Sequence, residues 1–293
     1  MHGWLILDKP LGLGSTQGVS AVKRALRQGG YAKAKVGHGG TLDPLATGVL
    51  PIALGEATKL AGRLLDSDKV YDFTIRFGEQ TDTLDLEGAV VATSDVRPTE
   101  AAISAVLPCF TGPIEQVPPA YSALKVAGER AYDLARAGAD VALPSRHVTI
   151  HALECQAVGE DTVTLTARVS KGTYIRSLAR DIALALGTVG HVTMLHRTKA
   201  GPFAIAQAIT LDKLHTAAMA RELEHLLLPL RAGLDDIPAL PLDPDQAGAL
   251  RQGRVLSGIA ADDGQYFACL GTDPVALVEV ADRTVRVVRG FNI

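Results

Sequence analysis

The sequence has 293 residues, 47% of them hydrophobic, and a formal net charge of −3 at pH 7. This content supplies a sizeable hydrophobic core, while no apolar stretch approaches the roughly 18 residues that a membrane helix needs. The N-terminus also lacks the basic start and apolar block of a signal peptide, so we expect a cytoplasmic protein with no membrane partner. The cysteines, Cys109, Cys155 and Cys269, are odd in number and widely spaced, which predicts buried free thiols and neither a disulfide framework nor a zinc site.

Positive charge is concentrated in two segments of the chain. Residues 1–60 carry seven Lys or Arg against three acids, and residues 165–200 carry six against one. If the two segments share a face, they form a positive surface that binds phosphates even though the total charge is negative. The alternative is a scatter of solvated side chains, and charge alone does not decide between the two.

The first predicted helix covers residues 17–28. Its apolar residues recur three and four positions apart, after the possible caps Ser15 and Thr16 and before the Gly29-Gly30 pair. A strand follows at 70–77, where alternation predicts one shared face made of Tyr71, Phe73, Ile75 and Phe77.

Further along the chain, a helix is expected after Thr99 and before Pro108, and a second alternating strand at 162–169. Apolar residues every fourth position predict a third helix at 174–186, on which Arg176 and Arg180 are stacked. Because helices and strands alternate irregularly, we predict an α+β fold with a mixed, largely antiparallel sheet flanked by helices.

A domain boundary is predicted near 235–242, where two prolines interrupt the pattern, so that residues 1–236 form one domain and 237–293 another. The second domain opens with a helix that has Asp243 as N-cap and Pro244 as first residue. It continues with three short strands at 265–270, 275–280 and 284–289. Together these elements predict a small β-rich module.

The turn at residues 37–44 presents a single carboxylate, Asp43, ahead of an apolar run. We interpret Gly37, Gly39 and Gly40 as positions that allow positive φ and close approach to a ligand. The Asp43-Pro44 pair favours a fixed turn, in which the carboxylate is held rigidly. Alternatively, Asp43 only caps the turn by accepting a backbone hydrogen bond, as Asp-Pro pairs often do.

Several motifs together resemble the tRNA pseudouridine synthase B family, almost from end to end. One departure is the Gly14-Ser15-Thr16 sequence, where the family often has Thr-Ser. The motifs are Leu7-Asp8-Lys9-Pro10-x-Gly12, Gly37-His38 through Lys59, Lys69-x-Tyr71, Pro118-Pro119-x-Tyr121-Ser122-Ala123 through Tyr132, Lys171-Gly172-Thr173-Tyr174-Ile175-Arg176, and Leu195-x-Arg197-Thr198.

The resemblance implies conversion of uridine 55 in the T loop of tRNA to pseudouridine, by a monomer that needs no cofactor and no metal. It implies that Asp43 is the nucleophile, attacking C1′ of the sugar or C6 of the base, and that Arg176 is its ion partner. Tyr71 would stack on the uracil and take part in removing the C5 proton. The alternative for Arg176 is a surface arginine, and the alternative for Tyr71 is an ordinary core aromatic.

The target uridine lies in a folded loop, so it has to be flipped out. The resemblance implies that His38, between glycines in a flexible turn, reaches outward and fills the vacated space. It makes Tyr174 and Leu195 walls of the uracil pocket, with Lys59 as a nearby cation. It also identifies 237–293 as a PUA-like RNA-binding domain, whose charge of −2, from five Arg and seven acids, predicts a modest share of binding.

Two other functions remain open at the level of sequence. One is an RNA-binding or RNA-folding factor with a vestigial pocket, although intact motifs speak against it. The other is a hydrolase that uses Asp43 on a glycosidic bond, which ordinarily needs a second carboxylate. No such partner is evident in the motifs.

Overall fold

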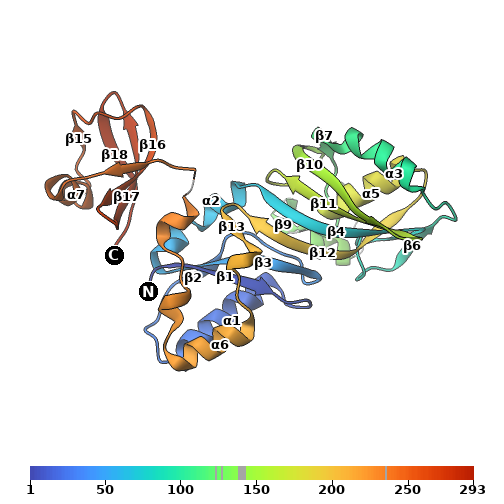
Figure 1. Ribbon diagram of the computed structural model, residues 1–293, viewed down its shortest axis with the longest axis horizontal. Helices are drawn as coiled ribbons and strands as arrows, with labels where there is room; N and C mark the ends of the chain where they lie inside the picture. The colour runs from blue at the N-terminus through green and yellow to red at the C-terminus, as the bar shows by residue number, and fades with distance from the viewer. Residues whose placement is uncertain (123, 127, 138–142, 235) are drawn as a thin grey trace.

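The computed structural model describes residues 1–122, 124–126, 128–137, 143–234 and 236–293, so Ala123 of the Pro118–Tyr132 motif lies outside the described residues. Within them, nine strands form one large sheet, antiparallel except where β3 runs parallel to β12 (Figure 1). Strands β2 (Val36–His38) and β13 (Phe203–Ala204) pair with β3 and β12, and the main order is β1 (Gly3–Lys9), β3 (Ala46–Leu54), β12 (Gly190–Ala200), β4 (Lys69–Phe77), β11 (Thr162–Val169), β10 (Arg146–Val158) and β7 (Gly112–Gln116).

Helices cover the two halves of this sheet separately. α1 (Ser15–Gln28) and α6 (Leu211–Ala220) pack side by side on the half that contains β1 and β3, and α3 (Glu100–Val106) and α5 (Ile175–Ala185) on the half that contains β10 and β11 (Figure 1). Two apolar cores result, one under each helix pair. This arrangement confirms the predicted α+β fold.

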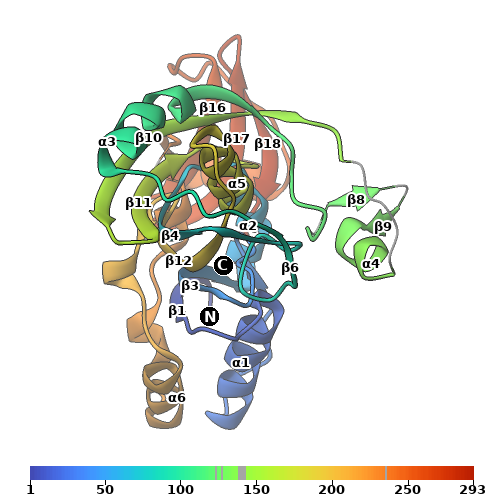
Figure 2. The same ribbon diagram turned by 90° about the vertical axis from the view of Figure 1, so that its right-hand side faces the viewer.

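The remaining short elements connect these layers. Figure 2 shows that β8, β9 and α4 stand out from the body of the molecule. Their bounds and those of the other connecting elements are η1 (Gly55–Lys59), α2 (Ala61–Asp66), β5 (Glu79–Thr81), β6 (Val90–Thr93), η2 (Leu107–Phe110), β8 (Lys125–Val126), β9 (Glu129–Arg130), α4 (Ala131–Arg136), η3 (Ile205–Gln207), η4 (Leu223–Leu226) and η5 (Leu230–Gly233).

The predicted elements are found with small shifts at their ends. Phe73, Ile75 and Phe77 of β4 are buried against α5, whereas Tyr71, on the same face, is only partly buried. The first helix begins at Ser15, two residues before the predicted start, with Gly14 as N-cap. Ser15 does not cap this helix, because its hydroxyl bonds to Leu42 instead.

The C-terminal residues form a separate β-rich domain, as predicted. The Asp243 carboxylate accepts from the Gln246 amide at 2.8 Å and so caps α7 (Pro244–Arg251). Two short strands, β14 and β15, were not predicted. The five-stranded sheet has the order β14 (Ala239–Pro241), β16 (Gly264–Leu270), β17 (Asp273–Ala281), β18 (Thr284–Gly290) and β15 (Leu256–Ser257).

The C-terminal domain is packed onto the N-terminal end of the chain. Phe267 and Phe291 share a buried apolar cluster with Trp4 and Phe203 of the large domain. Polar contacts surround this cluster. The Lys59 ammonium, for example, donates to the Gly290 carbonyl at 2.8 Å.

Two expectations from composition can be compared with the structure. The prediction of buried cysteines was wrong for Cys109 and Cys155, which are exposed, while Cys269 is partly buried. An apolar neighbour in sequence does not bury a thiol when the segment runs along the surface. Among the described residues, no helix is both long and apolar enough to cross a bilayer.

Candidate active site

A cleft of about 300 Å³ opens at the middle of the large sheet, where its two cores meet. Tyr71 on β4 and Leu195 on β12 mark this junction, because each packs against both apolar clusters. The cleft brings together five of the seven predicted site residues: Asp43, Tyr71, Tyr174, Arg176 and Leu195. Lys69 is among the lining residues that were not predicted to belong to the site.

Asp43 lies in the turn between β2 and β3, and its side chain is 44% exposed. The Ser15 hydroxyl donates to the Leu42 carbonyl at 2.9 Å and accepts from the Leu42 amide at 2.7 Å. Beyond Asp43, the buried Lys9 ammonium donates to the Pro44 carbonyl at 3.2 Å. The backbone is thus held on both sides of Asp43, while the carboxylate itself faces the cleft.

Arg197 holds the backbone at the start of the same turn. Its side chain is fully buried, and it donates to the carbonyls of Gly40 and Thr41, both at 3.2 Å, and of Val49 at 2.8 Å. A guanidinium suits this task because its planar fork serves several acceptors at once. The rigid presentation of Asp43 predicted from sequence therefore has a physical basis in buried cations.

Of the three glycines of the turn, only Gly40 has the positive φ that was predicted. Gly40 has φ of 135°, but Gly37 and Gly39 do not have positive φ. A Cβ on Gly39 would lie 2.5 Å from Cδ1 of Leu64, so this glycine allows close packing against α2 rather than against a ligand. Gly37 has open space around it, so neither a positive φ nor a close contact requires a glycine at this position.

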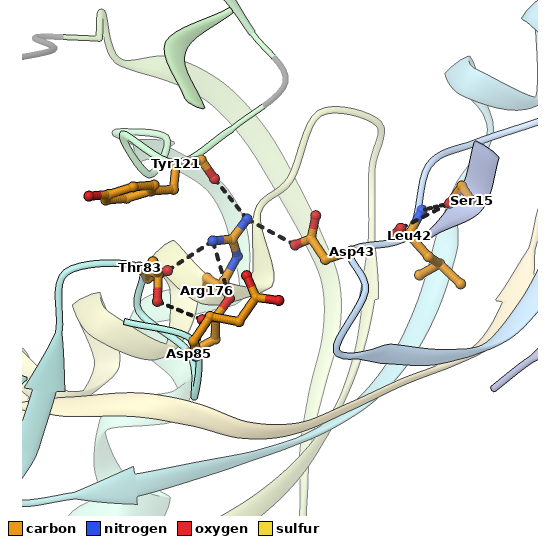
Figure 3. Close-up of polar contacts among 8 residues, drawn as sticks. Ser15, Leu42, Asp43, Thr83, Asp85, Tyr121 and Arg176 are labelled. Atoms are coloured by element: carbon orange, nitrogen blue, oxygen red, sulfur yellow. Dashed lines mark hydrogen bonds and ion pairs between the residues drawn. The ribbon is translucent and has the colours of Figure 1, made fainter. Parts of the chain in front are cut away.

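Arg176, near the start of α5, forms an ion pair with Asp43, with 2.9 Å between Nη2 and Oδ2 (Figure 3). Its side chain is only 8% exposed, which contradicts the alternative of a surface arginine. The same guanidinium donates to the carbonyls of Thr83 at 2.8 Å and Tyr121 at 3.0 Å. Arg176 therefore joins Asp43 to two distant segments of the chain.

A second carboxylate, Asp85, lies on the other side of Arg176, with 3.4 Å between Oδ2 and Nη1. Its Oδ1 accepts from the Thr83 hydroxyl at 2.6 Å (Figure 3). The same oxygen accepts from the Glu87 amide at 3.0 Å. Asp85 is buried and fully engaged, so it orients the guanidinium rather than facing the cleft.

The aromatic walls of the cleft come from two elements. Tyr71 is the residue of β4 opposite Ala167 and Arg197. Tyr174 is the N-cap residue of α5, and both its backbone amide, at 2.8 Å, and its carbonyl, at 3.1 Å, bond to the Gln116 side chain. Burial raises the pKa of the Tyr174 phenol above its ordinary value.

The arrangement places one accessible carboxylate beside a buried guanidinium and flat aromatic walls. Such a carboxylate is able to act as a nucleophile, as Asp and Glu do in covalent catalysis. The neighbouring rings offer faces on which a planar base can stack.

Comparison with known proteins decides the family. Residues 26–175 match the model described as TruB family pseudouridylate synthase (N terminal domain), and residues 176–235 match that of the tRNA pseudouridylate synthase B C-terminal domain. The protein named tRNA pseudouridine synthase B in Novosphingobium aromaticivorans is 69% identical, over 100% of this chain and 98% of its own length. The chain belongs to the TruB family of pseudouridylate synthases. It is accordingly an enzyme of the isomerase class.

Other TruB-family relatives and solved structures agree. The protein of the same name in Zymomonas mobilis is 60% identical, over 100% of this chain and 96% of its own length. A chain from the "Structure of H/ACA RNP bound to a substrate RNA containing 2'-deoxyuridine" superposes with a TM-score of 0.75 at 25% identity, covering 99% of this chain and 85% of that one. A chain of a Cbf5-Nop10-Gar1 complex gives 0.74 at 26% identity, with the same coverage.

Two residues predicted for the site of this TruB-family enzyme lie apart from the cleft, as far as the described residues define it. His38 is the last residue of β2, paired with Ile52 of β3, so it is in a strand and not in a flexible turn. Lys59 is held away from the cleft by Glu56, at 2.6 Å, and by the C-terminal domain. A motif gives the order of residues, but not which side of a strand or helix they occupy.

The structure adds residues to the TruB-family site that the motifs contained but did not single out. Lys69 lies at the cleft and donates to the carbonyls of Leu64 and Leu65 at the end of α2, at 2.8 and 2.9 Å. Burial lowers the pKa of Lys69 to about 8, and that of Lys9 likewise to about 8. In the sequence, both lysines stand at the end of a strand, Lys9 as the last residue of β1 and Lys69 as the first residue of β4, where a lysine ordinarily indicates solvent exposure.

His38 leads to a prediction about pH. Burial, and then the nearby Arg197, lower the pKa of His38 below 6.5. Between that lowered pKa and 6.5 the unfolded chain binds more protons than the folded one, so stability falls as the pH falls through this window. Urea unfolding at about pH 7.5 and about pH 5.5 should therefore show a smaller loss of stability for His38→Gln than for wild type. The exposed His147→Gln serves as control, and an equal loss in all three proteins would contradict the prediction.

Proposed function

We propose that the protein converts uridine 55 in the T loop of tRNA to pseudouridine, with Asp43 as the nucleophile. The observation that carries the proposal is the 2.9 Å ion pair between Asp43 and Arg176, at the mouth of a cleft large enough for a base. Two relatives named tRNA pseudouridine synthase B, 69% and 60% identical to this chain, support the choice of tRNA.

The reaction balances without any other reagent. The bond from ribose C1′ to uracil N1 breaks, the base rotates, and C1′ joins C5 instead. One proton leaves C5 and one is taken up at N1, so substrate and product are isomers. Attack of Asp43 at C1′ and attack at C6 both fit a carboxylate that is open to the cleft.

We propose that the other cleft residues bind and orient the base. Tyr71 stacks on the uracil and assists removal of the C5 proton, while Tyr174 and Leu195 form the walls. Arg176 holds the Asp43 carboxylate through the ion pair and keeps it directed into the cleft. His38, outside the cleft, would fill the space that the flipped uridine leaves in its loop.

A hydrolytic reaction is less well supported. It would need a second carboxylic acid that is able to donate a proton to the leaving base. Asp85 shares Arg176 with Asp43 and is a candidate for this role, but Arg176, Thr83 and the Glu87 amide occupy both of its oxygens. Release of free uracil from RNA would distinguish hydrolysis from isomerisation.

We further propose that residues 1–236 form the catalytic domain and residues 237–293 a PUA-like domain that adds RNA contacts. The separate five-stranded sheet, which begins at Ala239, supports this boundary. We propose that the enzyme acts as a monomer in the cytoplasm and binds the T stem-loop.

Mapping of pseudouridine in tRNA tests the proposed substrate. Cells that lack the protein should contain uridine in place of pseudouridine at position 55, and the wild-type gene should restore the modification. An unchanged level at position 55, together with a loss at another site, would overturn the assignment while leaving the family intact.

A further inference from the structure

A second hollow, of about 940 Å³, lies between the end of α1 and the segment that leads into β2. We call it the α1 groove. It is distinct from the catalytic cleft, since the two share no lining residue among those described. The residues used below are Lys23, Leu26, Arg27, Tyr31, Lys33 and Lys35.

The walls of the α1 groove are strongly basic. Four of its lining residues are Lys or Arg and none is acidic. The sequence contains no Asp or Glu between Asp8 and Asp43, so no neighbour in the chain neutralises them. All four side chains are exposed, and none forms an ion pair with a carboxylate in the described part of the chain. The groove is therefore a concentrated positive surface on a protein of negative net charge.

The floor of the groove is rigid and apolar. Leu26 is buried in the core beneath α1, and Tyr31 packs against the same core. The Tyr31 hydroxyl accepts from the Leu223 amide at 3.0 Å, and the Arg221 guanidinium lies 5.9 Å from the centre of its ring. A floor held in this way supports the part of the basic rim that α1 carries, Lys23 and Arg27.

The α1 groove is physically connected to the catalytic turn. α1 begins at Ser15, which bonds to Leu42 beside the nucleophile, and it carries Lys23 and Arg27 on one face, four residues apart. With a rise of 1.5 Å per residue, these side chains start about 12 and about 18 Å along the helix from Ser15. Gly37 lines the groove and Gly40 lines the cleft, at most about 11 Å apart over three Cα–Cα steps.

We propose that the α1 groove binds the sugar–phosphate backbone of the RNA substrate, at phosphates outside the loop that holds the target uridine. This inference rests on the proposed function for the identity of the RNA. Exposed, unpaired cations on a rigid support are suited to phosphate contacts, which position an RNA without reading its sequence. The groove would thus add affinity and leave the choice of uridine to the cleft.

Binding of an unmodified tRNA transcript at several salt concentrations tests the proposal. The measurement uses Arg27→Gln in the Asp43→Asn background, so that no RNA is converted during the experiment. Loss of one phosphate contact should weaken binding about fivefold near 0.1 M salt and reduce the slope of log K against log salt by about 1. The double variant Lys23→Gln/Arg27→Gln, which loses two phosphate contacts, should reduce the slope of log K against log salt by about 2.

The matched control is Arg24→Gln in the same background. Arg24 is an exposed residue of the same helix, with the same charge, but it does not line the groove. Its affinity and salt slope should equal those of the parent protein. Equal effects of Arg24→Gln and Arg27→Gln, or an unchanged salt slope in both, would overturn the proposal. Because the readout is binding, the result stands even if position 55 proves not to be the modified site.

Discussion

Replacing Asp43 with asparagine is expected to abolish pseudouridine formation, with a loss of more than about 10⁴-fold in single-turnover rate. The amide has almost the same shape as the carboxylate but lacks the negative charge that we propose attacks the substrate. The turn itself should remain folded, since Ser15 and Lys9 hold the backbone of Leu42 and Pro44 and not the Asp43 side chain. Binding of a T stem-loop should change by no more than about tenfold, or 1.4 kcal/mol.

The control for this substitution is Asp161→Asn. Asp161 forms an exposed ion pair with Arg76 at the far end of β4, and its replacement should leave the rate unchanged. If Asp43→Asn still converted uridine at a rate near that of wild type, the carboxylate would not be the nucleophile, and the mechanism would have to be abandoned.

Replacing Arg176 with lysine is expected to lower the rate by about 10² to 10³-fold, although the positive charge is kept. The guanidinium contacts two carboxylates and two carbonyls from one plane, and a lysine ammonium, with three donors on a single atom, does not span them. Asp43 would lose its orientation, and Asp85 would be left buried beside a poorly placed charge.

Arg180→Lys is the matched control for this second experiment. Arg180 lies one helical turn after Arg176 on α5 and pairs with Asp181 at 2.8 Å, away from the cleft. Its rate should be close to wild type. Urea unfolding shows whether both variants are folded under the conditions of the rate assay. If they are, a lower rate reflects a catalytic defect and not a folding defect. A normal rate for Arg176→Lys would mean that charge alone, without the planar fork, is sufficient.

Local sequence patterns predicted much of the fold because the elements concerned carry clear periodicity. The alternation in β4 buries Phe73, Ile75 and Phe77 as expected, and Asp243 caps α7 as predicted. The pairing of strands could not be read in the same way. The parallel contact of β3 with β12, which opens the cleft between two cores, joins residues about 150 positions apart, and no local pattern records it.

The candidate site shows the same division between local and distant information. Motifs identified Asp43 and Arg176, and the structure brings them together. The supports of the site were not foreseen, because Lys9 and Arg197 look like surface cations until the fold surrounds them with backbone carbonyls. Asp85 was also missed. Its partner Arg176 is far away in sequence. Asp85 also stands among the acids Glu79, Asp82 and Glu87, and such a cluster usually indicates a solvated surface.

The packing of Phe267 and Phe291 against Trp4 has a consequence for how the molecule unfolds. The first strand and the last residues of the chain contribute to one apolar cluster, so neither can detach without exposing the other's aromatic rings to water. The C-terminal domain is therefore part of the cooperative unit that keeps β1 in place, and through Lys9 on that strand it stabilises the position of the turn that carries Asp43.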